Sequence, residues 1–294
     1  MLFRSTSGHE DGSIADLTAA EAALHGLLLD WGCEVTFLRA ARVPDSDLSA
    51  ASLVTAAEFP SLDRYTVDAL IAAGQPVLLP HRAGAVVGGV WGNHSTTGGT
   101  RRLHVTADAC FLDGYASDLT LAVQDQEEGH YIDGSYPPGW SCAGANADDD
   151  AHQTVLHRET PGGGKGLIFT YDPAELSGPG RNLMDLAYGW LSGSPPHAGV
   201  TVPAGHVAFV ITGHADGGTP ELTAAETAHH GNLLDAGHQV TFLRLGRLAA
   251  SDLSAAALVT GVEYPSLDAG TAEQLLADGG RVLLIHTAGA VLGG

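Results

Sequence analysis

The feature that most constrains the fold of this 294-residue chain is a long internal repeat. A shift of 205 residues aligns residues 7–89 with residues 212–294 without a gap, and about 50 of the 83 aligned positions are identical. The stretch between the copies, from about residue 90 to residue 205, occurs once. We therefore expect a complete α/β domain at residues 1–200, followed by an incomplete second copy at residues 206–294.

Each copy alternates helix-like and strand-like segments. A helix is expected from Thr18, because Thr18 and Glu21 have the spacing of a capping box and Gly32 can end the helix. A second helix is expected from about Asp63 to Gly74, and strand-like runs such as EVTFLR and PVLLP lie between and after the helices. This alternation predicts an α/β fold with a doubly wound, mostly parallel sheet in the flavodoxin-like strand order 2-1-3-4-5.

The segment that occurs once, from about residue 90 to residue 205, has a different pattern from the repeated copies. It contains short β-like runs, then a predicted hairpin of HQTVLHRE and KGLIFTYD, then a predicted closing helix. The second copy has no counterpart of these segments and would contain four strands and two helices. Its fourth strand, Arg281–His286, would then lie at an open edge of the sheet.

An open apolar strand is prone to pair with other chains. Three explanations remain open: the chain is a piece of a longer array, another chain (identical or not) completes the second copy, or the copy packs back onto its own chain. A head-to-tail contact between chains would produce a filament or a shell.

Composition excludes several classes of partner. The formal net charge of −21 repels phosphate, so nucleic acids and anionic membranes are poor partners, and no apolar run reaches the roughly 18 residues of a membrane span. The three cysteines lack metal-ligand spacing, and no cofactor is expected. The amino terminus has no apolar signal segment, which favours the cytoplasm by default, or an extracellular location if the chain is a fragment of a longer surface or filament protein.

Polar residues follow several of the predicted strands, at the edge where open α/β sheets bind ligands. In the first copy they are His9, Asp11, Glu58 and His81, with Ser61 nearby, and in the second copy they are His214, Asp216, Glu263 and His286, with Ser266 nearby. Histidine and carboxylates could act as acid and base on a sugar hydroxyl. The candidates for holding a divalent metal are His9, Asp11 and Glu58, with His214, Asp216 and Glu263 in the second copy. The alternative is structural, with these side chains capping helices and bonding within turns.

Several segments, among them GHED, LLLDWGCEVTFLR, DLSAASLVTAAEFPSLD and GQPVLLPHRAGAVVGG, resemble the class I glutamine amidotransferase-like fold, and in particular its trehalose-utilisation-protein-like branch. In the amidotransferases proper, a nucleophilic Cys lies on a strand-to-helix turn of the form G-x-C-x-G. The matching turn here is LLPHRAG, and the resemblance places Arg82 at the Cys position, or Thr287 in the second copy. Glutaminase chemistry is therefore not expected.

Three functional hypotheses follow, and one of them is an interaction module within a larger enzyme. The lost nucleophile, the repeat and the incomplete copy favour a non-catalytic structural protein that assembles into a filament, tail or surface layer. The resemblance to the trehalose-utilisation branch implies the alternative, an enzyme or binding protein that acts on a carbohydrate through His9, Asp11, Glu58 and His81.

Overall fold

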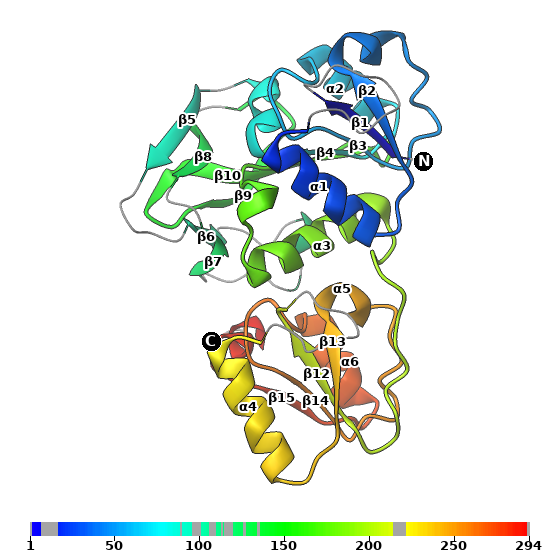
Figure 1. The fold of residues 1–294 in the computed structure, drawn as a ribbon, viewed down its shortest axis with the longest axis vertical. Coiled ribbons are helices and arrows are strands. Elements are labelled where there is room, and N and C mark those ends of the chain that lie inside the picture. Colours follow the sequence, from blue (N-terminus) through cyan, green and yellow to red (C-terminus); the bar gives the residue numbers. More distant parts are fainter. Residues whose placement is uncertain are drawn as a thin grey trace. The chain divides into compact units, whose positions relative to one another are not determined.

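The computed structural model describes residues 2–6, 17–88, 90–95, 101–105, 110–112, 114, 120–125, 128–133, 136–213 and 222–292 (Figure 1). The chain forms two compact units. The first contains Met1–Thr106, Ala122–Ser177 and Trp190–Gly193, and the second contains Ala107–Leu121, Gly178–Gly189 and Ser194–Gly294. These units are defined by contacts in space. The division into residues 1–200 and 206–294 is defined by the sequence repeat and stays a prediction.

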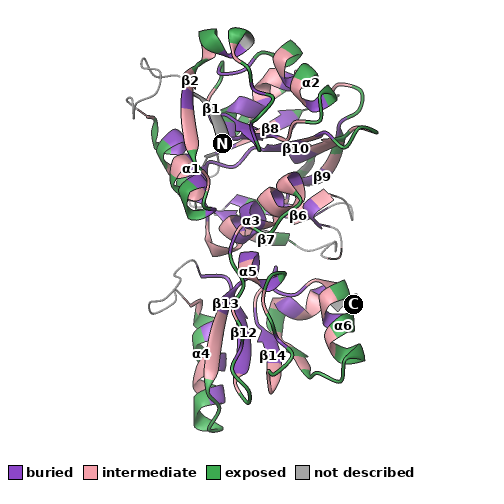
Figure 2. Cartoon of the chain, turned by 90° about the vertical axis from the view of Figure 1, so that its right-hand side faces the viewer, coloured by how far each residue is buried: buried purple, intermediate pink, exposed green. Residues whose placement is uncertain are grey.

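The first unit is built on one eleven-stranded sheet. Its strands are β1 (Leu2–Thr6), β2 (Val35–Arg39), β3 (Val54–Thr55), β4 (Val77–Pro80), β5 (Val90–Ser95), β6 (Arg101–Val105), β7 (Thr120–Gln124), β8 (Glu128–Asp133), β9 (Ser141–Asn146), β10 (Asp149–Glu159) and β11 (Lys165–Phe169). Its helices are α1 (Ala19–Asp30) and α2 (Arg64–Ala72), with short 3-10 turns η1 (Ala40–Asp45), η2 (His81–Val87) and η4 (Pro173–Glu175). Helices α1 and α2 lie on opposite sides of the strands in both ribbon views (Figures 1 and 2).

The expected fold class, a mostly parallel flavodoxin-like sheet, is wrong for this unit. The main path of the sheet is β2-β1-β3-β4-β11-β10-β9-β6-β7, with β5 and β8 joined beside β10. Pairing is parallel from β2 to β11, but β11–β10, β10–β9, β9–β6, β10–β8 and β5–β8 are antiparallel. No α-helix lies between β5 and β11 in the described residues, and without a crossover helix successive strands pair antiparallel.

Local predictions about the elements are confirmed. Thr18 caps α1, and the capping box with Glu21 is present in both directions. The Asp63 side chain accepts a hydrogen bond from the Thr66 amide at the start of α2. Strands β10 and β11 form the predicted hairpin.

The second unit contains a separate four-stranded parallel sheet in the order β13-β12-β14-β15. Its elements are β12 (Val207–Ile211), α4 (Ala224–Asp235), β13 (Val240–Arg244), α5 (Leu245–Leu248), β14 (Leu258–Gly261), α6 (Ala269–Ala277), β15 (Val282–Leu284) and the 3-10 turn η5 (His286–Leu292). Helices α4 and α6 lie on opposite sides of this sheet, with buried strand residues between them (Figure 2). The core gathers Val207, Phe209 and Ile211 from β12 with Leu233 from α4 and Val262 after β14.

Helix α3 (Gly178–Ser192) closes the first repeat in the sequence, yet most of it packs within the second unit. The Asn182 amide donates a hydrogen bond to the carbonyl of Ile211 at the end of β12. Asp185 of α3 makes a buried ion pair with Arg244 at the end of β13, at 3.2 Å. None of the described helices has both the length and the apolar character needed to cross a membrane.

Candidate functional site

Three neighbouring parallel strands of the first unit bring polar side chains to one edge of the sheet. Glu58 follows β3, His81 follows β4, and Asp172 follows β11. The carboxyl ends of parallel strands meet at the same edge, which is where open α/β sheets place their ligands. We call Glu58, His81, Asp172 and the neighbouring His130 the His81 site.

His81 has a strained backbone. Strand β4 ends at Pro80, and His81 turns the chain into η2 with φ of 52°, in the left-handed region that non-glycine residues rarely adopt. Its exposed fraction is only 8%. The strained residue lies one position before Arg82, the residue that the resemblance placed at the amidotransferase nucleophile. A strained turn that ends a parallel strand is a common position for a functional side chain.

Two carboxylates flank the His81 ring. Nδ1 lies 3.8 Å from Oε1 of Glu58, and Nε2 lies 3.6 Å from Oδ2 of Asp172. Both separations exceed the usual hydrogen-bond range. Nδ1 is buried and has no hydrogen-bond partner within the described part of the chain. The ring is therefore held by packing between the two acids and is not locked in a hydrogen-bonded relay.

Burial controls the protonation of the site. Burial, and then the charge of Arg82, lower the pKa of His81 to about 4 despite the two nearby carboxylates. Burial also raises the pKa of Glu58, although the hydrogen bond from the Thr18 hydroxyl, at 2.9 Å, opposes this. At neutral pH the imidazole is therefore uncharged, and a neutral imidazole can accept or donate a proton or a hydrogen bond.

Aromatic rings cover one side of His81. The His130 ring lies 4.8 Å from the His81 ring and stacks on Trp91 at 5.3 Å. The Nε of Arg82 donates to Nε2 of His130 at 3.4 Å. Trp91 and His130 come from β5 and β8, so the antiparallel part of the sheet contributes directly to this site.

The second copy builds a smaller version of the site from Thr223, Glu263, His286 and Thr287, here called the His286 site. Glu263 accepts hydrogen bonds from the hydroxyls of Thr223 at 3.0 Å and Thr287 at 2.9 Å, and lies 3.1 Å from Nδ1 of His286. His286 has the same left-handed φ of 52° as His81. Its side chain is 59% exposed, because no described strand occupies the place that β11 has in the first copy.

The structure tests only part of the predicted site. It brings Glu58 and His81 together, and likewise Glu263 and His286, while Ser61 and Ser266 are buried. His9, Asp11, His214 and Asp216 lie outside the described residues. In the residues that are described, no group of three or more His, Cys, Asp or Glu side chains is placed to hold a metal ion.

Sequence reasoning missed Asp172 and His130. Asp172 follows the apolar run GLIF, as Glu58 follows a predicted strand. The expectation that polar residues just after parallel strands lie at the ligand-binding edge therefore applies to Asp172 as well. No local pattern indicates His130, since it reaches the site through antiparallel pairing.

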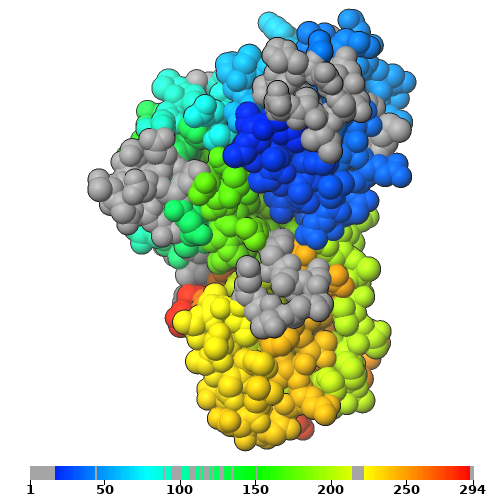
Figure 3. Space-filling model, viewed as in Figure 1, coloured from blue at the N-terminus to red at the C-terminus, as the bar shows by residue number. Residues whose placement is uncertain are grey.

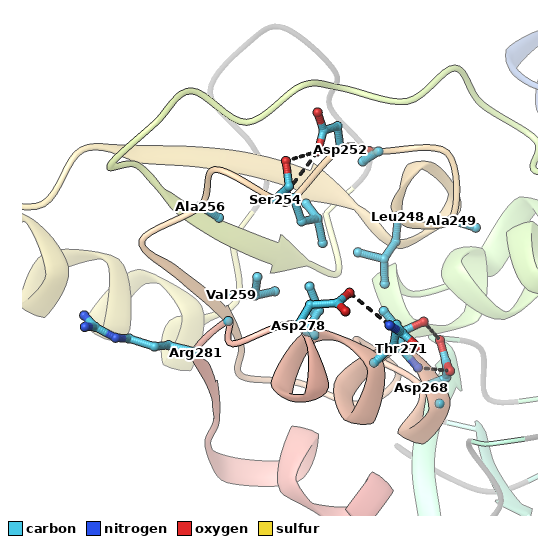
Figure 4. A pocket seen from close by; sticks show the side chains of 16 residues that line it. Leu248, Ala249, Asp252, Ser254, Ala256, Val259, Asp268, Thr271, Asp278 and Arg281 are labelled. Atoms are coloured by element: carbon cyan, nitrogen blue, oxygen red, sulfur yellow. Dashed lines mark hydrogen bonds between the residues drawn. The ribbon is translucent and has the colours of Figure 1, made fainter.

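Each copy also has a groove. In the first copy it lies between α2 and the segment after β2, and in the second copy it lies between α6 and the segment after β13. The groove of the second copy has a volume of about 620 Å³, and that of the first copy about 610 Å³. In the groove of the second copy, the Ser254 hydroxyl donates a hydrogen bond to Asp252 and the Thr271 hydroxyl donates one to Asp268. Arg281 also lines this groove (Figure 4). The lining of neither groove includes a residue of the His81 or His286 site.

Comparison with known proteins yields little. No family model and no curated protein sequence matches the chain. Among solved structures, the chain is similar to the crystal structure of Agd3, described as a novel carbohydrate deacetylase, with 13% sequence identity and a TM-score of 0.45. The match covers 87% of this chain but only 44% of that protein, so the chain spans less than half of its length.

Proposed function

We propose that this chain is a non-catalytic structural protein, built of tandem amidotransferase-like repeats, that assembles with further copies of itself through the β15 edge of its second unit. The observation that carries the proposal is the different environment of the same strand in the two copies. Strand β4 lies between β3 and β11, and all four of its residues are buried. Strand β15 has the equivalent sequence, but β14 is the only described strand that pairs with it.

Two equivalent leucines show this difference. Leu78 in β4 is 0% exposed, whereas Leu283 in β15 is 41% exposed. Strands of a parallel sheet are normally covered on both faces and paired on both sides, and an apolar edge strand presents unpaired backbone groups to any chain that can pair with it. An interface at β15 would give this strand the environment that β4 already has.

The test is the size of the purified protein. We expect light scattering on a sizing column, and negative-stain images of the same fractions, to show assemblies larger than the 30.1 kDa chain that grow with protein concentration. Leu283→Lys should shift the protein to monomers, because it places a charge at the centre of the proposed contact. The control is Leu234→Lys on α4, a helix at the surface of the second unit (Figure 3) where Leu234 is 52% exposed.

If the Leu283→Lys variant forms assemblies of the same size as the Leu234→Lys variant, β15 is not the contact. A wild-type protein that stays monomeric over the concentration range would contradict the proposal itself.

A second candidate function is the binding of a hydroxylated ligand such as a carbohydrate at the His81 site. It is favoured by the strained, buried His81, whose Nδ1 has no hydrogen-bond partner in the described residues. Isothermal titration of the wild-type protein and of a His81→Ala variant with a panel of mono- and disaccharides tests it. Binding that disappears in the variant would support this function, and identical heats in both proteins would contradict it.

A further inference from the structure

We propose that the groove of the first copy binds a neutral, polyhydroxylated ring such as a saccharide or a cyclitol. This groove has a volume of about 610 Å³, and the described residues that line it all belong to the first unit. A cleft of this size is large enough for a small organic ligand. The inference does not rest on assembly through β15, and the lining of the groove shares no described residue with the His81 site.

The floor of the groove is apolar and continues into the core of the first unit. Val43 and Leu48 are buried members of the core cluster, and Leu70 packs against that cluster. Tyr65, the second residue of α2, also lines the groove and is 87% exposed. A large aromatic ring that is left uncovered beside an apolar floor can stack on the C–H face of a ring-shaped ligand.

The polar groups of the lining offer mainly hydrogen-bond acceptors. The Ser46 hydroxyl donates to the carbonyl of Arg42 at 2.7 Å, and the Thr66 hydroxyl donates to the carboxylate that caps α2. These two donors are used within the protein, whereas both hydroxyl oxygens keep lone pairs. Nε2 of Gln75 donates to the carbonyl of Ser49 at 3.0 Å, but Oε1 of Gln75 is buried and has no hydrogen-bond partner among the described residues. The ligand that fits this lining therefore donates hydrogen bonds, as the hydroxyls of a polyol do.

The charge of the lining selects a neutral ligand. None of the described residues that line the groove of the first copy is charged. A charged ligand group would lose its hydration in the groove without an opposite charge to compensate for the loss. An uncharged ring with one apolar face and several hydroxyls meets both the apolar floor and the acceptors.

The groove of the second copy has a similar volume but a different lining. Gly270 stands at the position of Tyr65, so the aromatic ring is missing, and Asp278 stands at the position of Ala73. Asp278 accepts a hydrogen bond from Gln274 at 2.9 Å and lines that groove (Figure 4). We therefore expect one binding site per chain, in the first copy.

Isothermal titration with neutral monosaccharides, disaccharides and myo-inositol tests the inference. We expect the wild type to bind at least one of these compounds with one site per chain. Tyr65→Ala should lower the affinity about tenfold or more, because it removes the ring on which the ligand stacks. Gln75→Met keeps the length of the side chain but removes the acceptor, and should also weaken binding. The control is Leu29→Ala, which shortens an exposed side chain of α1 on the opposite side of the strands (Figure 2). Circular dichroism checks that every variant is folded.

The outcomes separate this inference from the proposed functions. Binding that is kept in Tyr65→Ala but lost in His81→Ala would place the ligand at the His81 site and overturn the inference. Equal affinities of Tyr65→Ala and Leu29→Ala, two sites per chain, or no binding of any compound would overturn it as well. A wild-type protein that binds the ligand but stays monomeric in light scattering would contradict only the proposed assembly through β15.

Discussion

At the scale of single residues, the environment of the buried His81 differs strongly from water. It is buried between Glu58 and Asp172, it has a left-handed backbone, and its pKa is lowered to about 4 mainly by burial. A histidine that is neutral in the folded protein but charged in the unfolded chain links stability to pH.

The direction of this link follows from the two pKa values. Between about pH 4 and pH 6.5 the unfolded chain binds a proton at His81 that the folded protein does not bind. The free energy of unfolding should therefore rise with pH through this window and level off above it. The contribution of this one group is on the order of 3 kcal/mol.

His81→Asn is the variant that isolates this effect, because asparagine tolerates the left-handed backbone but does not titrate. We expect urea denaturation between pH 4 and pH 8 to show a shallower pH dependence for this variant than for the wild type. Parallel curves for the two proteins would mean that His81 has the same pKa in the folded and the unfolded states.

At the scale of elements, the start of α4 couples a helix cap to the His286 site. The Thr223 hydroxyl accepts from the Glu226 amide at 3.1 Å and donates to Glu263 at 3.0 Å. Glu226 is buried and accepts from the amides of Thr212 at 2.8 Å and Thr223 at 2.9 Å. One hydroxyl therefore holds both the helix start and the carboxylate that contacts His286.

Thr223→Ala removes the cap and the hydrogen bond to Glu263, and we expect it to lower the free energy of unfolding by about 1–2 kcal/mol. Thr223→Ser keeps the hydroxyl and should have a much smaller effect. Chemical denaturation of the three proteins decides this, and equal losses for Ala and Ser would show that the methyl group matters and the hydroxyl does not.

The two copies of the fourth strand allow a matched comparison. Leu78→Lys introduces a charge into a fully buried strand, so we expect it to unfold the first unit or to lower its stability by several kcal/mol. Leu283→Lys places the same charge at an exposed edge and should change the free energy of unfolding by less than about 1 kcal/mol. Thermal denaturation followed by circular dichroism compares the two variants, and similar losses would mean that β15 is covered within the chain.

At the scale of the whole molecule, α3 links the two repeats. Its Asp185 is buried, lies 3.2 Å from an Nη atom of Arg244, and lies 3.3 Å from Nε2 of His197. A helix that the sequence assigns to the end of the first repeat therefore forms part of the second unit.

Asp185→Ala leaves Arg244 buried without its carboxylate, and we expect it to lower the free energy of unfolding by about 3–5 kcal/mol. The double variant Asp185→Leu with Arg244→Met replaces the ion pair by apolar side chains and should be more stable than the single variant. Chemical denaturation tests this, and a double variant no more stable than Asp185→Ala would show that the loss does not come from leaving Arg244 buried without its carboxylate.

The sequence alone determined the features that depend on neighbouring residues. Thr18 with Glu21, and Asp63 ahead of α2, mark helix starts because a cap is made within about one turn of the chain. The repeat indicated that β4 and β15 are equivalent, and the position of Glu58 and His81 after strands placed them at one edge of the sheet. Each of these inferences needs only a few consecutive residues and the direction of a strand.

The tertiary structure alone decided which distant segments meet. The antiparallel addition of β10, β9 and β6, the approach of Asp172 and His130 to His81, and the packing of α3 in the second unit all join residues far apart in the chain. Such contacts depend on the free energy of competing strand pairings and core packings, to which every segment contributes. A local pattern specifies the strand but does not specify its neighbour.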